Sequence, residues 1–567
     1  MTLRSTTRLL AGSLALLLAA CAGQDGSSGA TREEMLQTTH CDETCVVDQF
    51  KSLSKVFRPS GDEGAARAWV EQRVVDAIKA KTWKPSEVTT LKDAAGNLLV
   101  RIPATGRFAA LGLKAVAIQS HLDMILAVDG APPDAPLEPY FANGVDVVEE
   151  NGVLHSRDFK TTLGADDGAS VAQAVRYILD RSLPHPPLEL LFTTSEEIGL
   201  VGALALDVSA LPLSAAALIN MDGGPDTNDL MAPPGLMIGA NGGVVTHVDA
   251  TMPSSALVAS TKLLKMSLEG LAGGHSGIDI HESRMNAIRA LATLVQKANE
   301  VDPGVRLVDV SIGQVAARRG FNKIPSSFEA TLALSSDTDL EVVRSELLAL
   351  FAADLAMYTN ETPASVHLTI EPLPASAGGA VTHKFTSALV HALLIAPNGV
   401  IVANPDFPSG VERSSNLGIF GLDDATRSKK LYLSFMNRGF ELERNAEVAS
   451  AVLQPIRDAI VAGGGSEPVV TQAAFSPWLI DRQSDIVKVA QKGAPILQSI
   501  TILGAGNEPG VIAQKYPQLK NRTIGIVGPK VGCHSPQESM GVASYKAQTT
   551  AIQKAIEAFG DDPALLH

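Results

Sequence analysis

Basic charge, aromatic side chains and long apolar runs are all scarce in this sequence of 567 residues. Lys and Arg number 46 against 61 Asp and Glu, and the formal net charge of −15 argues against a nucleic-acid-binding role, which needs a basic surface. Aromatic residues make up only 4% while hydrophobic residues make up 45%, which is typical of a globular protein and not of a disordered or fibrous one. At this length we expect two or more domains.

The first residues lack an apolar run long enough to cross a bilayer and have the pattern of a targeting segment. Arg4 and Arg8 precede an apolar stretch at residues 9–20, and the Leu-Ala-Ala-Cys sequence that ends at Cys21 resembles a bacterial lipobox. We therefore expect a signal peptide at residues 1–20 and lipidation of Cys21. The alternative is an ordinary cleaved signal peptide in which Cys21 is incidental.

Lipidation of Cys21 would determine the cellular location of the protein. A multiply acylated Cys21 would hold the chain on a membrane, because two acyl chains suffice where one is marginal. Residues 21–48 would form the lipidated tether. We therefore expect an exported protein, anchored by lipid on the periplasmic side of the bacterial cell envelope.

Only four cysteines are present. Cys41 and Cys45 lie close together, and in an exported protein the default is a local disulfide between them. A metal site there is less favoured, since His40 alone is nearby as a third ligand. Cys533 would be an unpaired thiol.

Imidazole and carboxylate side chains follow the ends of several apolar segments that read as buried strands. His121 follows the segment at 114–119, Glu196 and Glu197 follow the one at 188–194, and Asp222 follows the one at 215–220. In open α/β sheets, ligands bind in the crevice outside the carboxyl ends of the strands. The sequence therefore predicts that these side chains meet at one edge of a sheet.

Two further residues complete this set. Asp166 precedes a helix expected at 169–179, and His534 lies in a loop after the apolar segment 523–527. Imidazole nitrogen and carboxylate oxygen suit a borderline-soft divalent ion such as Zn²⁺, with Mn²⁺ or Co²⁺ as alternatives. A single catalytic zinc uses about three protein ligands, so a larger set indicates two metal ions that share a bridge.

The residues around these side chains occur as an ordered series of motifs. They are Ser-His-Leu-Asp-Met at 120–124, Thr-Thr-Leu-Gly-Ala-Asp-Asp-Gly at 161–168, Phe-Thr-Thr-Ser-Glu-Glu-Ile-Gly at 192–199, Leu-Ile-Asn-Met-Asp at 218–222 and Gly-Cys-His-Ser-Pro-Gln-Glu at 532–538. From about residue 50 onward the chain resembles the aminoacyl-histidine (Xaa-His) dipeptidase branch of the co-catalytic dizinc peptidases. Aminoacylases and zinc carboxypeptidases belong to the same clan.

The resemblance implies a role for each of these residues. Asp166 would bridge the two metal ions, and the Asp166–Asp167 peptide would be cis. The other metal ligands would be His121, Asp222, Glu197 and His534. For Asp166 and Asp167 the alternative is that they only cap the following helix, as acidic residues often do.

Two carboxylates would act beside the metal ligands. Asp123 would accept the ring N–H of His121 and fix its orientation, as metal-bound imidazoles require; without Asp123, His121 would read as an ordinary core histidine. Adjacent residues that leave a strand point in opposite directions, so Glu196 and Glu197 can have different roles. The resemblance implies that Glu197 is the metal ligand and Glu196 the general base. A solvated acidic pair is the alternative for Glu196 and Glu197.

Four residues are expected around the substrate by the same resemblance. His275, in Gly-Gly-His-Ser-Gly, would stabilise the tetrahedral oxyanion, with a loop histidine bonded to backbone as the alternative. Asn322 would orient the substrate, and Arg438 would bind its terminal carboxylate, a geometry that a guanidinium fits. Gly510 would lie beside the substrate backbone.

The order of segments predicts an α/β fold. Alternating strands and helices imply a mostly parallel sheet with helices on both faces. We expect the catalytic domain to comprise residues 49–230 and 476–567, interrupted at 231–475 by an enlarged α+β lid. Ser60 and Glu63 have the spacing of a capping box at the start of a helix.

These expectations together predict an enzyme. It would hydrolyse the peptide bond of dipeptides, of Xaa-His type or broader, through a metal-bridging water and a Glu general base. One alternative is an N-acyl amino acid amidohydrolase or carboxypeptidase of the same clan. Another is a non-catalytic solute-binding lipoprotein. The oligomeric state stays open. The enlarged lid could supply His275 within one chain, or two chains could pair as a homodimer.

Overall fold

The computed structural model describes residues 40–132, 135–224, 227–316, 320–374, 378–407, 411–425 and 428–566. The predicted signal peptide, Cys21 and most of the predicted tether lie outside the described residues. Cys41 and Cys45 form a disulfide. Among the helices in these ranges, none combines the length and the apolar character that a membrane crossing needs.

The first sheet has nine strands and contains the segments that the sequence predicts to end at the site. Its order is β1 (Thr89–Lys92), β2 (Leu98–Ile102), β6 (Leu188–Thr193), β3 (Val116–His121), β7 (Ala217–Asn220), β21 (Thr523–Val527), β8 (Gly235–Ala240) and β19 (Trp478–Leu479), with β20 (Ile500–Leu503) paired to β8. The central neighbours β6, β3, β7 and β21 run parallel, and the strands at the β1 side are antiparallel. Parallel strands put their carboxyl ends at the same edge of the sheet.

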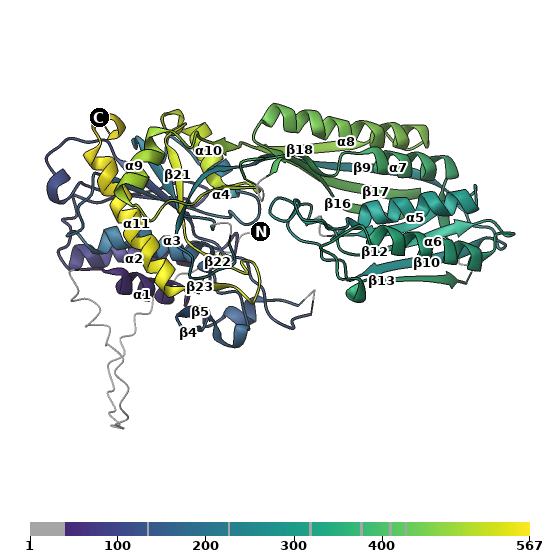
Figure 1. Ribbon diagram of the computed structural model, residues 1–567, viewed down its shortest axis with the longest axis horizontal. Helices are drawn as coiled ribbons and strands as arrows, with labels where there is room; N and C mark the ends of the chain where they lie inside the picture. Colours follow the sequence, from purple (N-terminus) through teal and green to yellow (C-terminus); the bar gives the residue numbers. More distant parts are fainter. Residues whose placement is uncertain are drawn as a thin grey trace, which may run out of the picture. The chain divides into compact units, whose positions relative to one another are not determined.

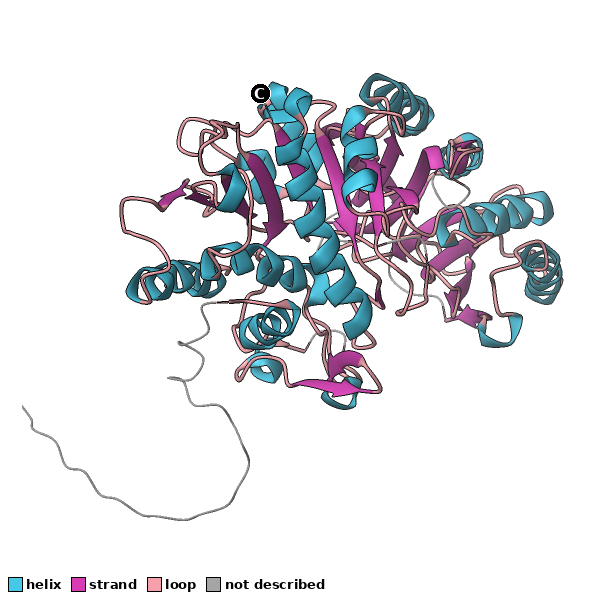
Figure 2. Cartoon of the chain, turned by 60° about the vertical axis from the view of Figure 1, so that its left-hand side comes forward, coloured by secondary structure: helices cyan, strands magenta, loops and turns pink. Residues whose placement is uncertain are grey.

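Helices cover both faces of this sheet, so its central strands are buried throughout. Neighbouring residues of one strand enter different hydrophobic clusters: Ile118 packs with the helices of one face and Ala117 with those of the other. The first face carries α2 (Gly64–Lys79), α3 (Ala165–Leu179), α9 (Asp485–Gly493) and α11 (Val542–Asp561), and the second carries α4 (Val201–Ala205) and α10 (Glu508–Lys515). Figure 2 shows helices packed against strands on both sides.

The second sheet has ten strands, all antiparallel to their neighbours. Its order is β13 (His367–Leu373), β10 (Lys262–Glu269), β12 (Phe328–Leu334), β11 (Arg306–Ile312), β16 (Val411–Ala425), β17 (Ser428–Gly439), β9 (Gly242–Ala256) and β14 (Gly379–Val381), with β15 (Gly399–Ala403) paired to β16 and β18 (Val469–Phe475) paired to β9. Four helices lie along it (Figure 1): α5 (Ala287–Val301), α6 (Leu340–Leu355), α7 (His383–Ile395) and α8 (Leu442–Ala462). They share one hydrophobic core with the strands.

A small sheet and several short elements complete the described part of the chain. Its four strands are β22 (Lys530–Val531), β23 (Ser539–Gly541), β5 (Val153–Ser156) and β4 (Val147–Glu150). The remaining helices are α1 (Glu43–Leu53) and α12 (Pro563–Leu566), with 3-10 turns at Gly106–Phe108, Glu138–Phe141, Arg157–Phe159, Pro363–Ser365 and Pro517–Leu519. The small sheet contributes to the site, because the loop between β22 and β23 contains His534.

The predicted α/β class is confirmed, with a mostly parallel central region, flanking helices and an inserted second sheet. The predicted capping box is wrong. Helix α2 begins at Gly64 without a side-chain cap, and Glu63 instead accepts hydrogen bonds from Gly61 N and from both N and Oγ of Ser195. Ser60 donates to Asp123. Ser60 thus contacts the segment that follows β3, and Glu63 contacts the segment that follows β6.

Candidate active site

The sheet order brings the predicted ligands together. His121 is the last residue of β3, which lies between β6 and β7. Glu197 follows β6, and Asp222 follows β7 by two residues. Asp166 lies at the beginning of α3, where the Asp166–Asp167 peptide is cis.

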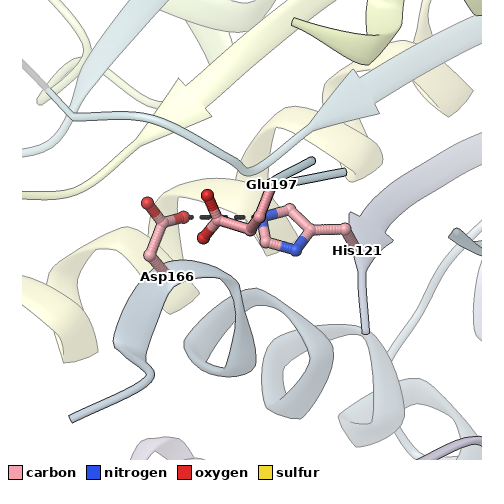
Figure 3. A group of neighbouring side chains, drawn as sticks. All are labelled: His121, Asp166 and Glu197. Carbon is pink, nitrogen blue, oxygen red and sulfur yellow. Dashed lines mark ion pairs between the residues drawn. The ribbon is translucent and has the colours of Figure 1, made fainter. Parts of the chain in front are cut away.

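Asp166 faces a different histidine with each of its carboxylate oxygens. Its Oδ1 lies 3.6 Å from His121 Nε2, and its Oδ2 lies 3.4 Å from His534 Nε2. His534 Nε2 is also 2.8 Å from Oε2 of Glu197. Figure 3 shows the side chains of His121, Asp166 and Glu197 pointing toward one another from three separate segments. This is the arrangement that a bridging carboxylate requires.

Two overlapping groups of side chains could each hold a metal ion. One is His121, Asp166 and Glu197, and the other is Asp166, Asp167 and Asp222; in each, the ligand atoms lie within 4.8 Å of one another. Asp166 belongs to both. Asp167, which the sequence assigns to helix capping, is fully buried and accepts a hydrogen bond from His121 N at 3.2 Å.

The electrostatics of the cluster favour divalent cations. Burial raises the pKa of the Asp222 carboxyl well above its usual value, and Asp166 raises it further. Burial lowers the pKa of His534, but hydrogen bonds to Asp166 and Glu197 outweigh this effect and raise it to about 11. One oxygen of Glu197, Oε1, is buried without a hydrogen-bond partner among the described residues. Several buried carboxylates and an unpartnered oxygen fit the ligand set of two metal ions, whose binding would displace protons.

Asp123 lies beside His121 and is hydrogen-bonded to the loop after β6 and to Ser60. Its Oδ1 lies 3.3 Å from His121 Nδ1, although this contact lacks hydrogen-bond geometry. The same carboxylate accepts hydrogen bonds from the backbone N–H groups of Glu196 and Glu197 at 3.0 and 3.2 Å, and from Ser60 Oγ at 2.7 Å. Asp123 therefore fixes the loop after β6 by hydrogen bonds and places its carboxylate beside the imidazole of His121.

The loop that precedes Asp166 is held by a buried carboxylate and a buried guanidinium. Glu538 accepts from the backbone N–H groups of Leu163, Gly164 and Asp166 at 2.9, 2.7 and 3.0 Å. Arg58 is fully buried and donates to the carbonyl oxygens of residues 122, 123 and 164. Sequence reasoning assigns neither role. Glu538 has a signal, since it ends the motif at 532–538, whereas nothing local distinguishes Arg58.

Glu508 is a second buried carboxyl that sequence reasoning misses. Its Oε2 accepts from Thr193 Oγ1 at 2.6 Å and from Gln119 Nε2 at 2.5 Å, and Gln119 Oε1 accepts from Asn220 Nδ2 at 2.6 Å. Burial raises the pKa of Glu508 to about 7. The network ties the carboxyl ends of β3, β6 and β7 to the start of α10.

Lys530 contacts the carboxylate of Asp166. Its side chain is 6% exposed, and Nζ lies 3.3 Å from Asp166 Oδ1 and 3.5 Å from Asp167 Oδ1. The sequence gives no indication of this contact.

His275 and Arg438 meet within the second sheet and its loops. The backbone N–H groups of Gly277 and Ile278 donate to His275 Nδ1, both at 3.2 Å, so Nε2 carries the proton of the neutral ring. Arg438, on β17, has Nη2 3.5 Å from that Nε2. Burial lowers the pKa of His275 well below its usual value, and Arg438 lowers it further. Two donors, an imidazole N–H and a guanidinium, therefore converge.

The other two predicted substrate residues, Asn322 and Gly510, have contacts within the protein. The carbonyl oxygen of Asn322 accepts from Ser276 N at 2.8 Å, which ties it to the loop of His275. Gly510 lies in α10, and a Cβ there would meet Ser476 O at 2.2 Å. Close contact with the chain before β19 thus explains this glycine without a substrate.

Known peptidases are similar to this chain in sequence or in fold. The cytosol non-specific dipeptidase of Escherichia coli K12 is 29% identical over 483 residues, which are 82% of this chain and 90% of the relative. The crystal structure of an aminoacylhistidine dipeptidase from Vibrio alginolyticus has a TM-score of 0.67 at 22% identity, covering 90% of this chain and 96% of its own. A tripeptidase from Staphylococcus aureus has a TM-score of 0.53 at 14% identity, covering 92% and 100%. No family model matches the chain.

One prediction is overturned by these relatives. The expected location, lipid-anchored on the periplasmic side of the cell envelope, is wrong, because the relative aligned with 82% of this chain is a cytosol dipeptidase. The expected location depends on a basic and apolar pattern in about twenty N-terminal residues. The similarity to the cytosol dipeptidase extends over 483 residues and outweighs it. The chain is a homologue of the cytosol non-specific dipeptidase and has the lid-bearing peptidase fold of the Vibrio aminoacylhistidine dipeptidase.

Proposed function

We propose that this protein is a metal-dependent dipeptidase that hydrolyses the peptide bond of dipeptides. The observation that carries the proposal is the position of Asp166 between His121 and His534, with one carboxylate oxygen toward each imidazole. Homology to a dipeptidase over most of the chain supports the same activity.

In this proposal Asp166 holds both metal ions. His121 and Asp222 complete the ligand set of one ion, and Glu197 and His534 complete that of the other. We propose Zn²⁺, because two imidazoles and three carboxylates suit it well. When bound, two such ions polarise the scissile carbonyl and lower the pKa of the attacking water.

Glu196 acts as the general base. Its backbone is fixed by the hydrogen bond to Asp123, and burial raises the pKa of its carboxyl well above the usual value. A carboxylate with a raised pKa accepts the proton of the attacking water more readily, and the protonated form then donates it to the leaving amine.

Arg438 and His275 supply the groups that bind the substrate. Arg438 is 3% exposed, and burial lowers the pKa of its guanidinium to about 9 without an opposing carboxylate among the described residues. A buried guanidinium without a counter-ion suits the free C-terminal carboxylate of a dipeptide. The Nε2–H of His275 is available to the developing oxyanion. Asn322 positions the loop of His275, and a contact between Gly510 and the substrate backbone remains a prediction.

We also propose the division into a catalytic domain and an inserted lid, with one change of boundary. Strand β8 pairs with β20 and β21 of the nine-stranded sheet, so we begin the lid at residue 242 and not at residue 231.

A preference for Xaa-His substrates and a homodimer remain predictions. Light scattering of the purified protein tests the second.

The activity is tested with purified protein by measuring metal content and hydrolysis together. The substrates are a panel of dipeptides that includes several Xaa-His members, with N-acetyl amino acids and C-terminally amidated dipeptides as comparison. We expect two metal ions per chain, rapid cleavage of free dipeptides and little cleavage of the other two groups. Preferential cleavage of N-acetyl amino acids would identify an amidohydrolase instead, and no cleavage of any substrate by the metal-loaded protein would overturn the proposal.

A further inference from the structure

The ammonium group of Lys530 lies among the carboxylates of the candidate metal centre. Its side chain is 6% exposed, and its Nζ donates to Asp166 Oδ1 at 3.3 Å. It also lies 3.5 Å from Asp167 Oδ1, an oxygen that has no hydrogen-bond partner in the described part of the chain. Lys530 belongs to β22, so the position of its backbone is set by the small sheet.

The contact is directed at one of the two proposed metal positions. Asp166 Oδ1, the oxygen that Lys530 contacts, is also the oxygen 3.6 Å from His121 Nε2. Oδ2, on the other side of the carboxylate, faces His534. Lys530 therefore shares its acceptor with the position of His121 and Asp222 and not with the position of Glu197 and His534.

A fixed positive charge has two opposed effects here. It neutralises part of the charge of Asp166, Asp167 and Asp222, whose oxygens lie within 4.8 Å of one another, and so stabilises the cluster without a metal ion. It also repels a divalent cation on the same carboxylate and draws electron density from the shared oxygen. The first effect favours the folded metal-free protein, and the second weakens one metal position selectively.

We propose that Lys530 makes the two metal positions unequal. The Glu197–His534 position fills first and tightly, and the His121–Asp222 position binds its ion more weakly and reversibly. This inference rests on the proposed two-metal dipeptidase. Lys530 is a positioning residue: it acts through Asp166 and Asp167 and has no assigned contact with substrate.

The test is a calorimetric titration of Zn²⁺ into metal-depleted protein, with the stoichiometry checked by elemental analysis. We expect wild-type protein to bind two ions with separate dissociation constants, and Asp222→Asn to lose the weaker event. Lys530→Met should tighten the weaker event by about 10–100-fold, the usual size of an effect from a neighbour of a metal ligand, and leave the tighter event unchanged. Its metal-free form should also melt at a lower temperature than the wild type.

Three comparisons make the result decisive. Lys530→Arg keeps the charge and should keep the gap between the two constants, while Lys520→Met repeats the substitution at an exposed site and should behave as wild type. Lys530→Thr replaces Lys530→Met if the latter does not fold. Constants in the Lys530 variants within twofold of wild type would overturn the inference and leave the dipeptidase proposal intact. Fewer than two bound ions in wild-type protein would overturn the two-metal proposal itself.

Discussion

At the scale of the residue, Glu196 and Glu197 are chemically identical neighbours in different surroundings. Glu197 contacts His534 at 2.8 Å and belongs to a group that could hold a metal ion, whereas Glu196 belongs to neither such group. Both backbone N–H groups donate to Asp123, which fixes the direction in which each side chain leaves the loop. The two substitutions to Gln should therefore have different consequences.

We expect Glu196→Gln to retain the fold and both metal ions, because the amide is nearly isosteric with the carboxylate. Its kcat should fall by about 10²–10⁴-fold with KM little changed, since a positioned base is lost. Glu197→Gln should instead lose bound metal, because an amide is a poorer ligand. Steady-state kinetics and metal analysis of both variants check this. Metal loss in Glu196→Gln with retention in Glu197→Gln would mean that the roles are exchanged.

Residue-level reasoning selects the five proposed ligands because each lies at the end of an apolar segment or inside a recognisable motif, and the fold brings their side chains close together. It does not find Lys530 or Arg58. Lys530 meets Asp166 across 364 residues of sequence, and Arg58 meets the carbonyl of Gly164 across 106. A single basic residue has no local pattern, so only the fold shows what it contacts.

At the scale of the element, the strands are predicted better than the helix boundaries. Segments that become β3, β6, β7 and β21 are buried over their whole length, and this leaves a continuous apolar run in the sequence. The capping box fails for a different reason. Ser60 and Glu63 have the right spacing, but their side chains bond to Asp123 and Ser195, and these tertiary contacts replace the local ones.

Helix α10 provides an element-scale prediction. The absence of a side chain at Gly510 lets the helix approach Ser476 O, which would lie 2.2 Å from an added Cβ. Gly510→Ala should therefore lower the free energy of unfolding by about 1–3 kcal/mol, the usual cost of overpacking. Urea denaturation measures it. Gly64→Ala at the first residue of α2 is the control, because its Cβ would meet only the end of Arg67 at 3.9 Å. Unchanged stability with a raised KM would instead support substrate contact at Gly510.

At the scale of the whole molecule, the sequence predicts the fold class and the inserted lid but not the location of the protein. The alternation of strands and helices is repeated many times along the chain, so errors in single elements do not alter the class. The expected location depends on a short N-terminal pattern alone. The proposed beginning of the lid moves from residue 231 to residue 242 because β8 pairs with β20 and β21 of the first sheet, and strand pairing is a property of the fold.

Burial of Glu508 affects the stability of the whole molecule, because this carboxyl joins β3, β6 and α10. Its pKa is raised to about 7 by burial, whereas an unfolded chain has the usual value near 4.5. Between these values the folded protein holds a proton that the unfolded chain has lost. The contribution to stability is therefore complete below about pH 4.5 and is lost as the pH rises through 7.

Glu508→Gln should remove this dependence, because the amide reproduces the neutral form of the carboxyl at every pH. The shift corresponds to about 3 kcal/mol, so relative to the variant, wild-type protein should lose up to about this amount between pH 5 and pH 8. Urea unfolding of both proteins at several pH values, with the same metal content, measures the difference. Glu371→Gln, at an exposed position of β13, controls for the substitution itself. Parallel stability curves for wild-type and Glu508→Gln protein would contradict a protonated Glu508, and the network around Gln119 and Thr193 would then hold an ionised carboxylate.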